Sequence, residues 1–208
     1  MSGIRINFAA RLALILLTFA LISVTLCSAT LQMTVNNGRI VQVQFPQNGM
    51  IVDMDGAGTI GKISLTSLPI TAAIDGVGNI LQANGQGTVY YYEDGKIKQI
   101  GDVYLYYYGE GMLKQIADLY LYYYGDRKAK QIVDVYLYYY GEGMLKQIAD
   151  LYLYYYEDRN LKQIGDVYLY YYGDGKVKQI GDIYIYYYGD GSFKETSGSD
   201  SRVQLSIS

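Results

Sequence analysis

The chain has 208 residues, of which 50% are hydrophobic, and a formal net charge of −3. This length is enough for a domain with a hydrophobic core, and the slightly acidic balance argues against a nucleic-acid-binding surface. Histidine and tryptophan are absent, and the one cysteine is Cys27, near the N-terminus. Without an imidazole base, and with no thiol beyond the N-terminal segment, the chain is expected to have no enzymatic activity, no cofactor and no metal site.

Residues 1–29 have the pattern of a signal peptide. Arg5 and Arg11 make the start positive, and an apolar run of 15 residues from Leu12 to Leu26 follows, ending in small residues. This arrangement predicts cleavage after Ala29. The run is short for a membrane-spanning helix, and an uncleaved membrane anchor is the alternative interpretation.

Cleavage at this point predicts an exported protein, located in the periplasm, at the cell surface or outside the cell. Loss of the two arginines lowers the net charge to −5, and the chain that remains contains no cysteine. An exported chain without disulfides must be held together by packing and backbone pairing alone. Contact with a membrane is expected only through the signal segment, unless the chain forms a barrel.

Residues 30–89 are expected to form an irregular β-structured N-terminal cap. Apolar and polar residues alternate on both sides of Asn36-Asn37-Gly38, which is typical of a hairpin. We expect a three-residue loop with Gly38 in the left-handed conformation, which would place Val41 on the apolar face. Pro46 is expected to end the second strand.

Asp-Gly pairs recur at residues 55, 75 and 94, at spacings of 20 and 19 residues. We interpret them as turns between short strands, because aspartate and glycine both favour turn conformations. No part of the region has helical periodicity. The segment is therefore expected to be the terminal cap that a repeat array needs.

Residues 90–195 contain a 16-residue unit six times, as in YYYGEGMLKQIADLYL, and a seventh copy that starts at Tyr186 and fades after Lys194. All 27 tyrosines lie in this array. Apolar and polar residues alternate over most of each copy, and tyrosine, valine, isoleucine and leucine suit a pleated sheet. We predict an all-β fold, an antiparallel β-meander of six to seven tyrosine-rich repeats, with a parallel β-solenoid or a closed barrel as alternatives.

Each copy is expected to form one long strand that ends at its glycine turn. The alternation places Gln115 and Leu121 on an aliphatic face, and Ile116 and Tyr122 on the opposite, tyrosine-rich face. A second corner at Gly101 is conceivable, but its counterpart two copies later is Val133, and valine disfavours positive φ. We therefore expect a bend within the strand there.

The meander is preferred to the solenoid on electrostatic grounds. A solenoid would stack Asp102 and its counterparts directly on one another, and like charges opposite each other destabilise a sheet. For the register of the meander we favour a turn centred on Gly111, which sets Asp102 beside Tyr120. A sheet with two partly apolar faces must be covered: by the cap on one face, by closure into a barrel, or by association of copies.

Residues 196–208 are expected to be a polar tail, because the segment begins with a run rich in serine and glycine. Val203, Leu205 and Ile207 alternate with polar residues near the C-terminus. This alternation predicts a last edge strand.

The candidate ligand-binding residues are tyrosines of the array, because a dense row of rings with hydroxyls can stack on the apolar faces of sugars. Cross-strand aromatic pairs also stabilise sheets, which is the purely structural interpretation. The repeated aspartates supply one carboxylate per copy and no EF-hand-like loop, so no calcium site is predicted. The candidates are Tyr104, Tyr106, Tyr108, Tyr120, Tyr122, Tyr124, Tyr136, Tyr138 and Tyr140.

Tyrosine-rich strands separated by Gly-Asp-Gly turns resemble the bacterial surface proteins built from β-hairpin repeats, such as the YD-repeat and choline-binding types. The resemblance covers only residues 90–194 and remains at the level of the class. The repeats of those proteins are somewhat longer. This chain also lacks the tryptophan of the choline binders, so no ligand site is carried over.

We therefore expect an exported, non-enzymatic repeat protein that acts as a structural or adhesive scaffold at the cell surface or in the extracellular matrix. The first alternative is a glycan-binding module that uses the tyrosine face. The second is an outer-membrane β-barrel. The expected partner is a glycan or a second copy of the chain.

Overall fold

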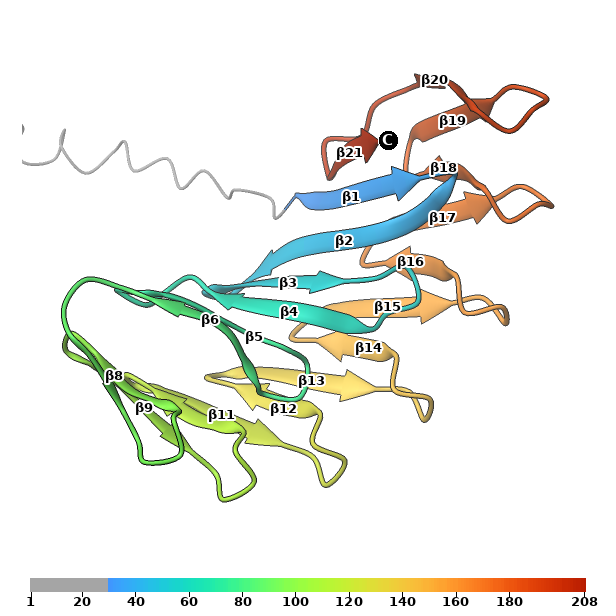
Figure 1. The fold of residues 1–208 in the computed structure, drawn as a ribbon. Coiled ribbons are helices and arrows are strands. Elements are labelled where there is room, and N and C mark those ends of the chain that lie inside the picture. The colour runs from blue at the N-terminus through green and yellow to red at the C-terminus, as the bar shows by residue number, and fades with distance from the viewer. Residues whose placement is uncertain (1–29) are drawn as a thin grey trace, which may run out of the picture.

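A computed structural model describes residues 30–208, so the predicted signal peptide lies outside the described residues. Every regular element in this range is a β-strand, and the strands form two sheets (Figure 1). A seven-stranded sheet, here the cap sheet, has the order β21-β1-β2-β3-β4-β5-β6. A fourteen-stranded sheet, here the array sheet, runs without interruption from β7 to β20.

The strands of the cap sheet are β1 (Leu31–Asn36), β2 (Arg39–Gln47), β3 (Met50–Met54), β4 (Ile60–Leu65), β5 (Thr71–Ile74), β6 (Ile80–Asn84) and β21 (Val203–Ile207). The strands of the array sheet are β7 (Val89–Tyr91), β8 (Ile97–Ile100), β9 (Val103–Tyr107), β10 (Leu113–Ile116), β11 (Leu119–Tyr123), β12 (Ala129–Ile132), β13 (Val135–Tyr139), β14 (Leu145–Ile148), β15 (Leu151–Tyr155), β16 (Leu161–Ile164), β17 (Val167–Tyr171), β18 (Val177–Ile180), β19 (Ile183–Tyr187) and β20 (Phe193–Ser197).

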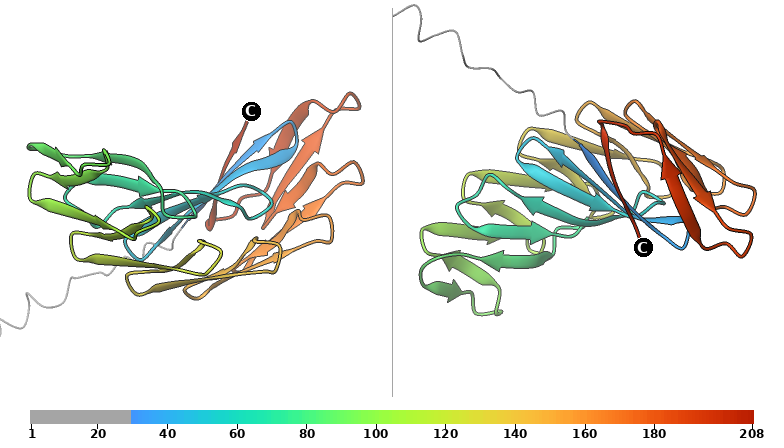
Figure 2. Two further views of the ribbon diagram at one scale, coloured as in Figure 1. Left: turned by 60° about the horizontal axis from the view of Figure 1, so that its bottom comes forward. Right: turned by 90° about the horizontal axis from the view of Figure 1, so that it is seen from above.

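The predicted antiparallel meander is confirmed. Each strand of the array sheet pairs with its neighbours in sequence, so Gln115 of β10 lies opposite Tyr106 of β9 on one side and Tyr120 of β11 on the other. The sheet is open, with β7 and β20 as its edges (Figure 2). The array is therefore neither a closed barrel nor a parallel solenoid.

The prediction of one long strand per repeat is wrong, because each repeat forms two strands. Ile116 of β10 pairs with Leu119 of β11 across a two-residue turn, and the same tight turn recurs in every copy. Its first residue has positive φ whatever its side chain, with values of 55° at Gly101 and 55° at Val133. The steric cost of such a residue is about 1–2 kcal/mol, which is small beside the pairing and burial of a hairpin.

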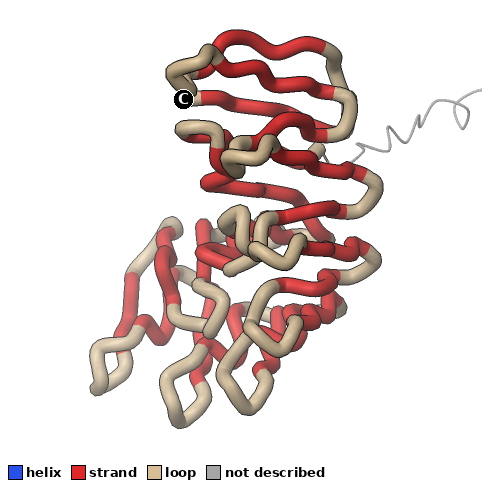
Figure 3. Tube along the Cα trace, turned by 90° about the vertical axis from the view of Figure 1, so that its right-hand side faces the viewer, coloured by secondary structure: helices blue, strands red, loops and turns tan. Residues whose placement is uncertain are grey.

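The glycine turn at the other end of each hairpin is a longer loop. Tyr108 N donates to Met112 O at 2.9 Å, and Gly111, at φ 89°, donates its N–H to Tyr108 O at 2.9 Å. Arg127 holds the same position at φ 70° and forms an ion pair with Glu110 of the preceding loop. These loops follow one another along one side of the molecule (Figure 3).

A β-bulge after each glycine turn explains why the predicted faces and register were partly wrong. The pairing shifts between Leu113 and Gln115, so that Lys114 is an extra residue in β10. Leu113 and Ile116 consequently both point inward, although the simple alternation put Ile116 on the tyrosine face. Tyr120 lies opposite Gln115, not beside Asp102 as predicted.

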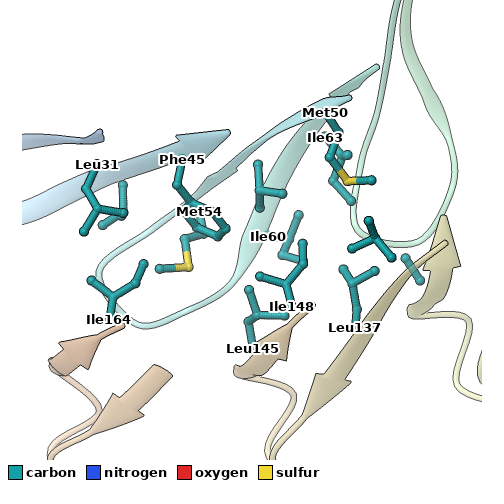
Figure 4. Close-up of a cluster of buried hydrophobic side chains, with 14 of the residues drawn as sticks. Leu31, Phe45, Met50, Met54, Ile60, Ile63, Leu137, Leu145, Ile148 and Ile164 are labelled. Carbon is teal, nitrogen blue, oxygen red and sulfur yellow. The ribbon is translucent and has the colours of Figure 1, made fainter. Parts of the chain in front are cut away.

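The cap sheet covers the aliphatic face of the array sheet. Leu121 is fully buried while Tyr122 next to it faces solvent, as the alternation within β11 predicted. Side chains of the two sheets interdigitate in one continuous core, where Phe45 and Met54 of the cap approach Ile164 of the array (Figure 4). The cap therefore supplies the cover that an amphipathic sheet needs.

The turns of the cap sheet also hydrogen-bond to the array through their backbone. Each Asp-Gly-x-Gly turn serves two successive hairpins, and its glycines leave no room for a Cβ: at Gly78, a Cβ would collide with the hydroxyl of Tyr123. The bonds are Leu113 N to Gly78 O, Ala129 N to Gly76 O, Leu145 N to Gly58 O, Leu161 N to Gly56 O and Val177 N to Gly38 O, at 2.7–3.1 Å. The glycines of the cap thus set where each pair of hairpins sits.

The first hairpin of the cap differs from its prediction in three details. Asn36 pairs with Arg39, so the turn has two central residues rather than three, and both have positive φ, as a type I′ turn requires. A bulge in the pairing of β1 with β2 then turns Val41 to solvent. Pro46 does not end β2 but pairs with Ile51 of β3, beyond the reach of β1, so its missing N–H breaks no bond of the ladder.

The C-terminal segment forms β21, which pairs in parallel with β1 at the edge of the cap sheet. Asp200 holds this segment against the array: it accepts hydrogen bonds from Arg202 at 2.6 and 2.9 Å and from Asp182 N at 3.2 Å. These bonds, chiefly that from Arg202, hold the pKa of the Asp200 carboxyl far below its ordinary value. Arg202 also donates to Asp166 O at 3.0 Å, so the clamp joins the tail to two tight turns.

Candidate binding surface

The face of the array sheet turned away from the cap carries two exposed tyrosines per hairpin. In the strand pattern LYLYY, Leu121 points into the core, and alternation therefore turns Tyr120 and Tyr122 outward. Their counterparts have almost the same exposure, between 40% and 47% of each residue. We call this surface the open tyrosine face. Its members are Tyr104, Tyr106, Tyr120, Tyr122, Tyr136, Tyr138, Tyr152, Tyr154, Tyr168, Tyr170, Tyr184 and Tyr186.

A glutamine separates the outward tyrosines of neighbouring hairpins. Gln115 has Tyr106 as its partner on one neighbouring strand and Tyr120 on the other. The same triplet recurs along the sheet. The triplets are Tyr90, Gln99 and Tyr104; Tyr106, Gln115 and Tyr120; Tyr122, Gln131 and Tyr136; Tyr138, Gln147 and Tyr152; Tyr154, Gln163 and Tyr168; Tyr170, Gln179 and Tyr184.

The side-chain amide of each glutamine is anchored to its own tight turn. Gln115 Nε2 donates to Ala117 O at 2.8 Å, and Gln131 Nε2 donates to Val133 O at 2.7 Å. The same bond is present in all six hairpins. One amide hydrogen is committed to the turn, which fixes the side chain, and the amide oxygen between the two aromatic rings is left to accept a hydrogen bond from a ligand.

Six of the nine predicted binding residues lie on the open tyrosine face, and three do not. Tyr108, Tyr124 and Tyr140 are half-buried at the glycine turns, and their hydroxyls donate to backbone carbonyls of the next hairpin at 3.0 Å. Tyr108 also meets the ring of Tyr123 edge-on, with centroids 5.9 Å apart. These three residues join neighbouring hairpins, and their hydroxyl hydrogens are not free to donate to a ligand.

The remaining tyrosine of each repeat points inward. Tyr123 is half-buried and its hydroxyl donates to Leu113 O at 2.7 Å. Burial raises the pKa of its hydroxyl well above the ordinary value, and the same effect raises the pKa of Tyr107 to about 12. Tyr139 and Tyr187 are the two counterparts whose buried hydroxyls have no hydrogen-bond partner among the described residues.

Grooves lie between successive glycine loops, beside the open tyrosine face. The groove next to the first two loops has a volume of about 790 Å³ and is lined by Tyr92, Asp94, Lys98 and Tyr106, among others. A smaller one of about 360 Å³ between later loops includes Lys162. In each repeat a lysine lies over the ring of the turn tyrosine, with Nζ 5.5–6.0 Å from the centroid. The groove walls therefore combine aromatic rings with positive charge.

The glutamines and the grooves were missed by sequence reasoning. The signal was present, since the tripeptide Lys-Gln-Ile is identical in all six complete copies. A polar residue that does not vary between copies, while the residues on either side of the tripeptide do, indicates a fixed hydrogen bond. The alternation alone placed these glutamines on the aliphatic side, because the bulge was not foreseen.

Within residues 30–208, no group of three or more aspartate, glutamate, histidine or cysteine side chains lies close enough together to hold a metal ion. The described part of the chain also has no helix with the length and hydrophobicity needed to cross a bilayer. A comparison with protein-family models gave no match, and a comparison with curated proteins gave none either.

Proposed function

We propose that the chain is an exported, non-enzymatic repeat protein that acts as a structural and adhesive scaffold at the cell surface or in the extracellular matrix. The observation that carries the proposal is the asymmetry of the array sheet. One face is sealed by the cap, while the other keeps two exposed tyrosines in every hairpin. Large exposed apolar surfaces on soluble proteins usually mark interaction sites.

The chemistry of tyrosine supports adhesion through this face. Its side chain offers a large rigid surface and a hydroxyl, and it loses little conformational entropy on binding. Because the hairpins form one sheet, the triplets are held in a fixed array. Several weak contacts made at once then add up to a durable attachment.

The experiment compares binding of the purified protein to an envelope or matrix preparation from the source cells. Tyr120 and Tyr122 are changed to serine, with their counterparts in the next two hairpins, and we expect binding to fall at least tenfold. The control changes Lys130 and Lys146, which lie over the rings of the turn tyrosines Tyr124 and Tyr140, to serine. Unchanged binding of the tyrosine variants would contradict the proposal.

Export is tested separately. The N-terminus of the protein recovered outside the cytoplasm should begin at Thr30, and protease added to intact cells should reach the glycine loops or the protein should be found in the medium. A chain that keeps Met1 and stays in the cytoplasm would contradict a surface or matrix role.

A second candidate, glycan binding by the same face, is favoured by the Tyr–Gln–Tyr triplets. Two aromatic rings with an amide oxygen between them can stack on the apolar faces of a sugar and accept a hydrogen bond from one of its hydroxyls. The probes are insoluble cellulose, chitin and peptidoglycan in a pull-down assay. Gln131→Leu, which keeps the rings and removes the amide, should weaken retention, whereas equal retention of this variant and the unaltered protein would argue for stacking without the triplet.

A further inference from the structure

Neighbouring hairpins inside the array sheet are joined by a recurring contact between two tyrosines. Each end of the sheet carries one of the two partners of this contact and lacks the other. At each internal junction, the turn tyrosine of one hairpin meets the inward tyrosine of the next, as Tyr108 meets Tyr123. The hydroxyl of Tyr108 also donates to Leu121 O of that next hairpin at 3.0 Å. The same pair of interactions occurs at the junctions that start from Tyr92, Tyr124, Tyr140, Tyr156 and Tyr172.

The C-terminal end of the array presents a turn tyrosine without an inward tyrosine to contact. Tyr188 is the last turn tyrosine, and its hydroxyl makes no hydrogen bond within residues 30–208, although Lys194 still lies over its ring at 6.0 Å. Tyr188 is 56% exposed. Phe193 of β20 is 44% exposed, although its counterparts Leu113 and Val177 are fully buried.

The N-terminal end of the array presents an inward tyrosine without a turn tyrosine to contact. Tyr91 of β7 holds the inward position of the first hairpin and is 61% exposed, because no turn tyrosine precedes it. Val89 holds the position of Leu105 and Leu121, whose carbonyl groups accept the tyrosine hydroxyl elsewhere. Val89 is 38% exposed, whereas Leu105 is fully buried.

The cap sheet ends at the same two places. Its edge strand β6 leads directly into β7, and β20 leads directly into its other edge strand, β21 (Figure 1). Each end of the molecule therefore offers one edge strand of each sheet. Leu81 of β6 is exposed as well.

We propose that these ends join, so that copies of the chain assemble head to tail through their array sheets. Tyr188 of one copy would meet Tyr91 of the next and donate its hydroxyl to the carbonyl of Val89. Edge β20 would pair with edge β7 as β18 pairs with β19. The contact uses two different surfaces, so it propagates into a filament rather than closing as a symmetric dimer.

The charged residues of β20 do not exclude this contact. Lysine on an edge strand commonly guards against pairing, but Lys194 occupies the position of Lys178 and Lys162, whose strands are paired on both sides. Among the charged residues of β20, only Glu195 departs from the repeat, where it replaces the glutamine, and the neutral Thr196 replaces the isoleucine that follows. In the next copy, Thr88 would lie opposite Glu195. Thr88 is the counterpart of Tyr104, and it is a small polar residue that leaves space for the carboxylate.

The inference does not depend on the ligand of the open tyrosine face, and its test uses the purified protein in sedimentation velocity over a wide range of concentration. We expect the average mass of the unaltered protein to rise with concentration. Tyr91→Lys blocks one end and Phe193→Lys blocks the other, so each variant alone should remain a monomer. Both positions are exposed, and circular dichroism checks that the variants stay folded.

The decisive experiment is to mix the two blocked variants. Each retains the end that the other lacks, so an equimolar mixture should form a dimer of one copy of each and grow no further. Tyr122→Lys, on the open tyrosine face, is the matched control and should assemble like the unaltered protein. A monomer at all concentrations, assembly of either blocked variant alone, or a mixture that stays monomeric would each overturn the proposal.

Discussion

The cap sheet and the array sheet enclose one core, yet they are built by different rules. The cap has seven strands of uneven length with unequal turns, and its large buried side chains include Phe45 and Met33. The array has short strands that alternate between four and five residues from β8 to β19, each pair closed by the same bulge and the same tight turn. The array repeats one local structure, and the irregular cap packs against it.

The contact between the sheets shows how this adaptation works. The cap advances by one Asp-Gly-x-Gly turn where the array advances by two hairpins, and the glycine carbonyls of each turn accept one backbone N–H from each of the two. A stretch of 20 cap residues therefore corresponds to 32 array residues. The array therefore has a constant spacing between hairpins, and the cap provides one turn that binds it for every two hairpins.

The largest expected effect comes from breaking this correspondence. Deleting residues 122–153 removes two hairpins and leaves β4 and β5 without array strands beneath them, which exposes buried side chains such as Ile63. Deleting residues 58–77 as well removes β4 and β5 and restores a turn in which Gly56 and Gly78 again face Leu161 and Leu113. In denaturant unfolding, the array deletion alone should cost several kcal/mol more than the double deletion. Equal costs would mean that the two sheets are not matched.

A charge in the shared core should have the next largest effect. Leu121→Asp places a carboxylate without a partner among aliphatic side chains and should lower the free energy of unfolding by about 4 kcal/mol or more. Tyr122→Asp, one residue away on the open tyrosine face, should change it by less than about 1 kcal/mol. Chemical denaturation of both variants checks the prediction, and similar losses would mean that both faces are covered.

The two faces of the array sheet show which parts of the structure could be predicted from the sequence. The 16-residue period and the alternation within LYLYY were sufficient for the meander, for the burial of Leu121 and for the exposure of Tyr122. The hairpin within each repeat was missed, because the steric argument about Val133 was taken as decisive, and the sequence alone did not show the hydrogen bond from Gln131 that accompanies its turn. A single repeat can therefore be removed without reversing the strands that follow, contrary to what a one-strand repeat would imply.

The candidate site was predicted only in its general character. Tyrosine composition indicated an aromatic surface, but the four tyrosines of a repeat take three different environments. Alternation separates the inward Tyr123 from the outward Tyr120 and Tyr122, whereas Tyr124 lies beyond the end of β11, at the glycine turn. The bulge depends on pairing across the glycine turn, which alternation along one strand does not contain. For the same reason Gln115 was assigned to the wrong side.

A smaller effect distinguishes two inward tyrosines that the sequence makes equivalent. Tyr123→Phe removes a bond to Leu113 O and should cost about 1 kcal/mol of the free energy of unfolding. Tyr139→Phe removes a buried hydroxyl without a partner in residues 30–208 and should be neutral or stabilising. Thermal or chemical unfolding of the pair checks this, and an equal loss in both would show that Tyr139 has a partner after all.

The smallest expected effect is on alkaline stability. Burial raises the pKa of Tyr107 from 10.0 to about 12, so the folded chain binds this proton more tightly than the unfolded chain. Stability should therefore be constant below about pH 10 and should fall as the pH rises toward 12. Tyr107→Phe should make that decline shallower. A pH profile identical to that of the unaltered protein would contradict the assignment.

The array exposes one row of tyrosines and encloses another, and both the binding surface and the shared core depend on this arrangement. Nitration of tyrosine by tetranitromethane, followed by mass spectrometry of the peptides, reads each row directly. In the native protein, Tyr120, Tyr122 and their counterparts on the open tyrosine face should be nitrated, while Tyr123 and its enclosed counterparts should react only after unfolding. The enclosed counterparts are Tyr107, Tyr139, Tyr155, Tyr171 and Tyr187. Equal reactivity of the two rows, or protection of Tyr120 and Tyr122 at a concentration where the protein is monomeric, would contradict the account.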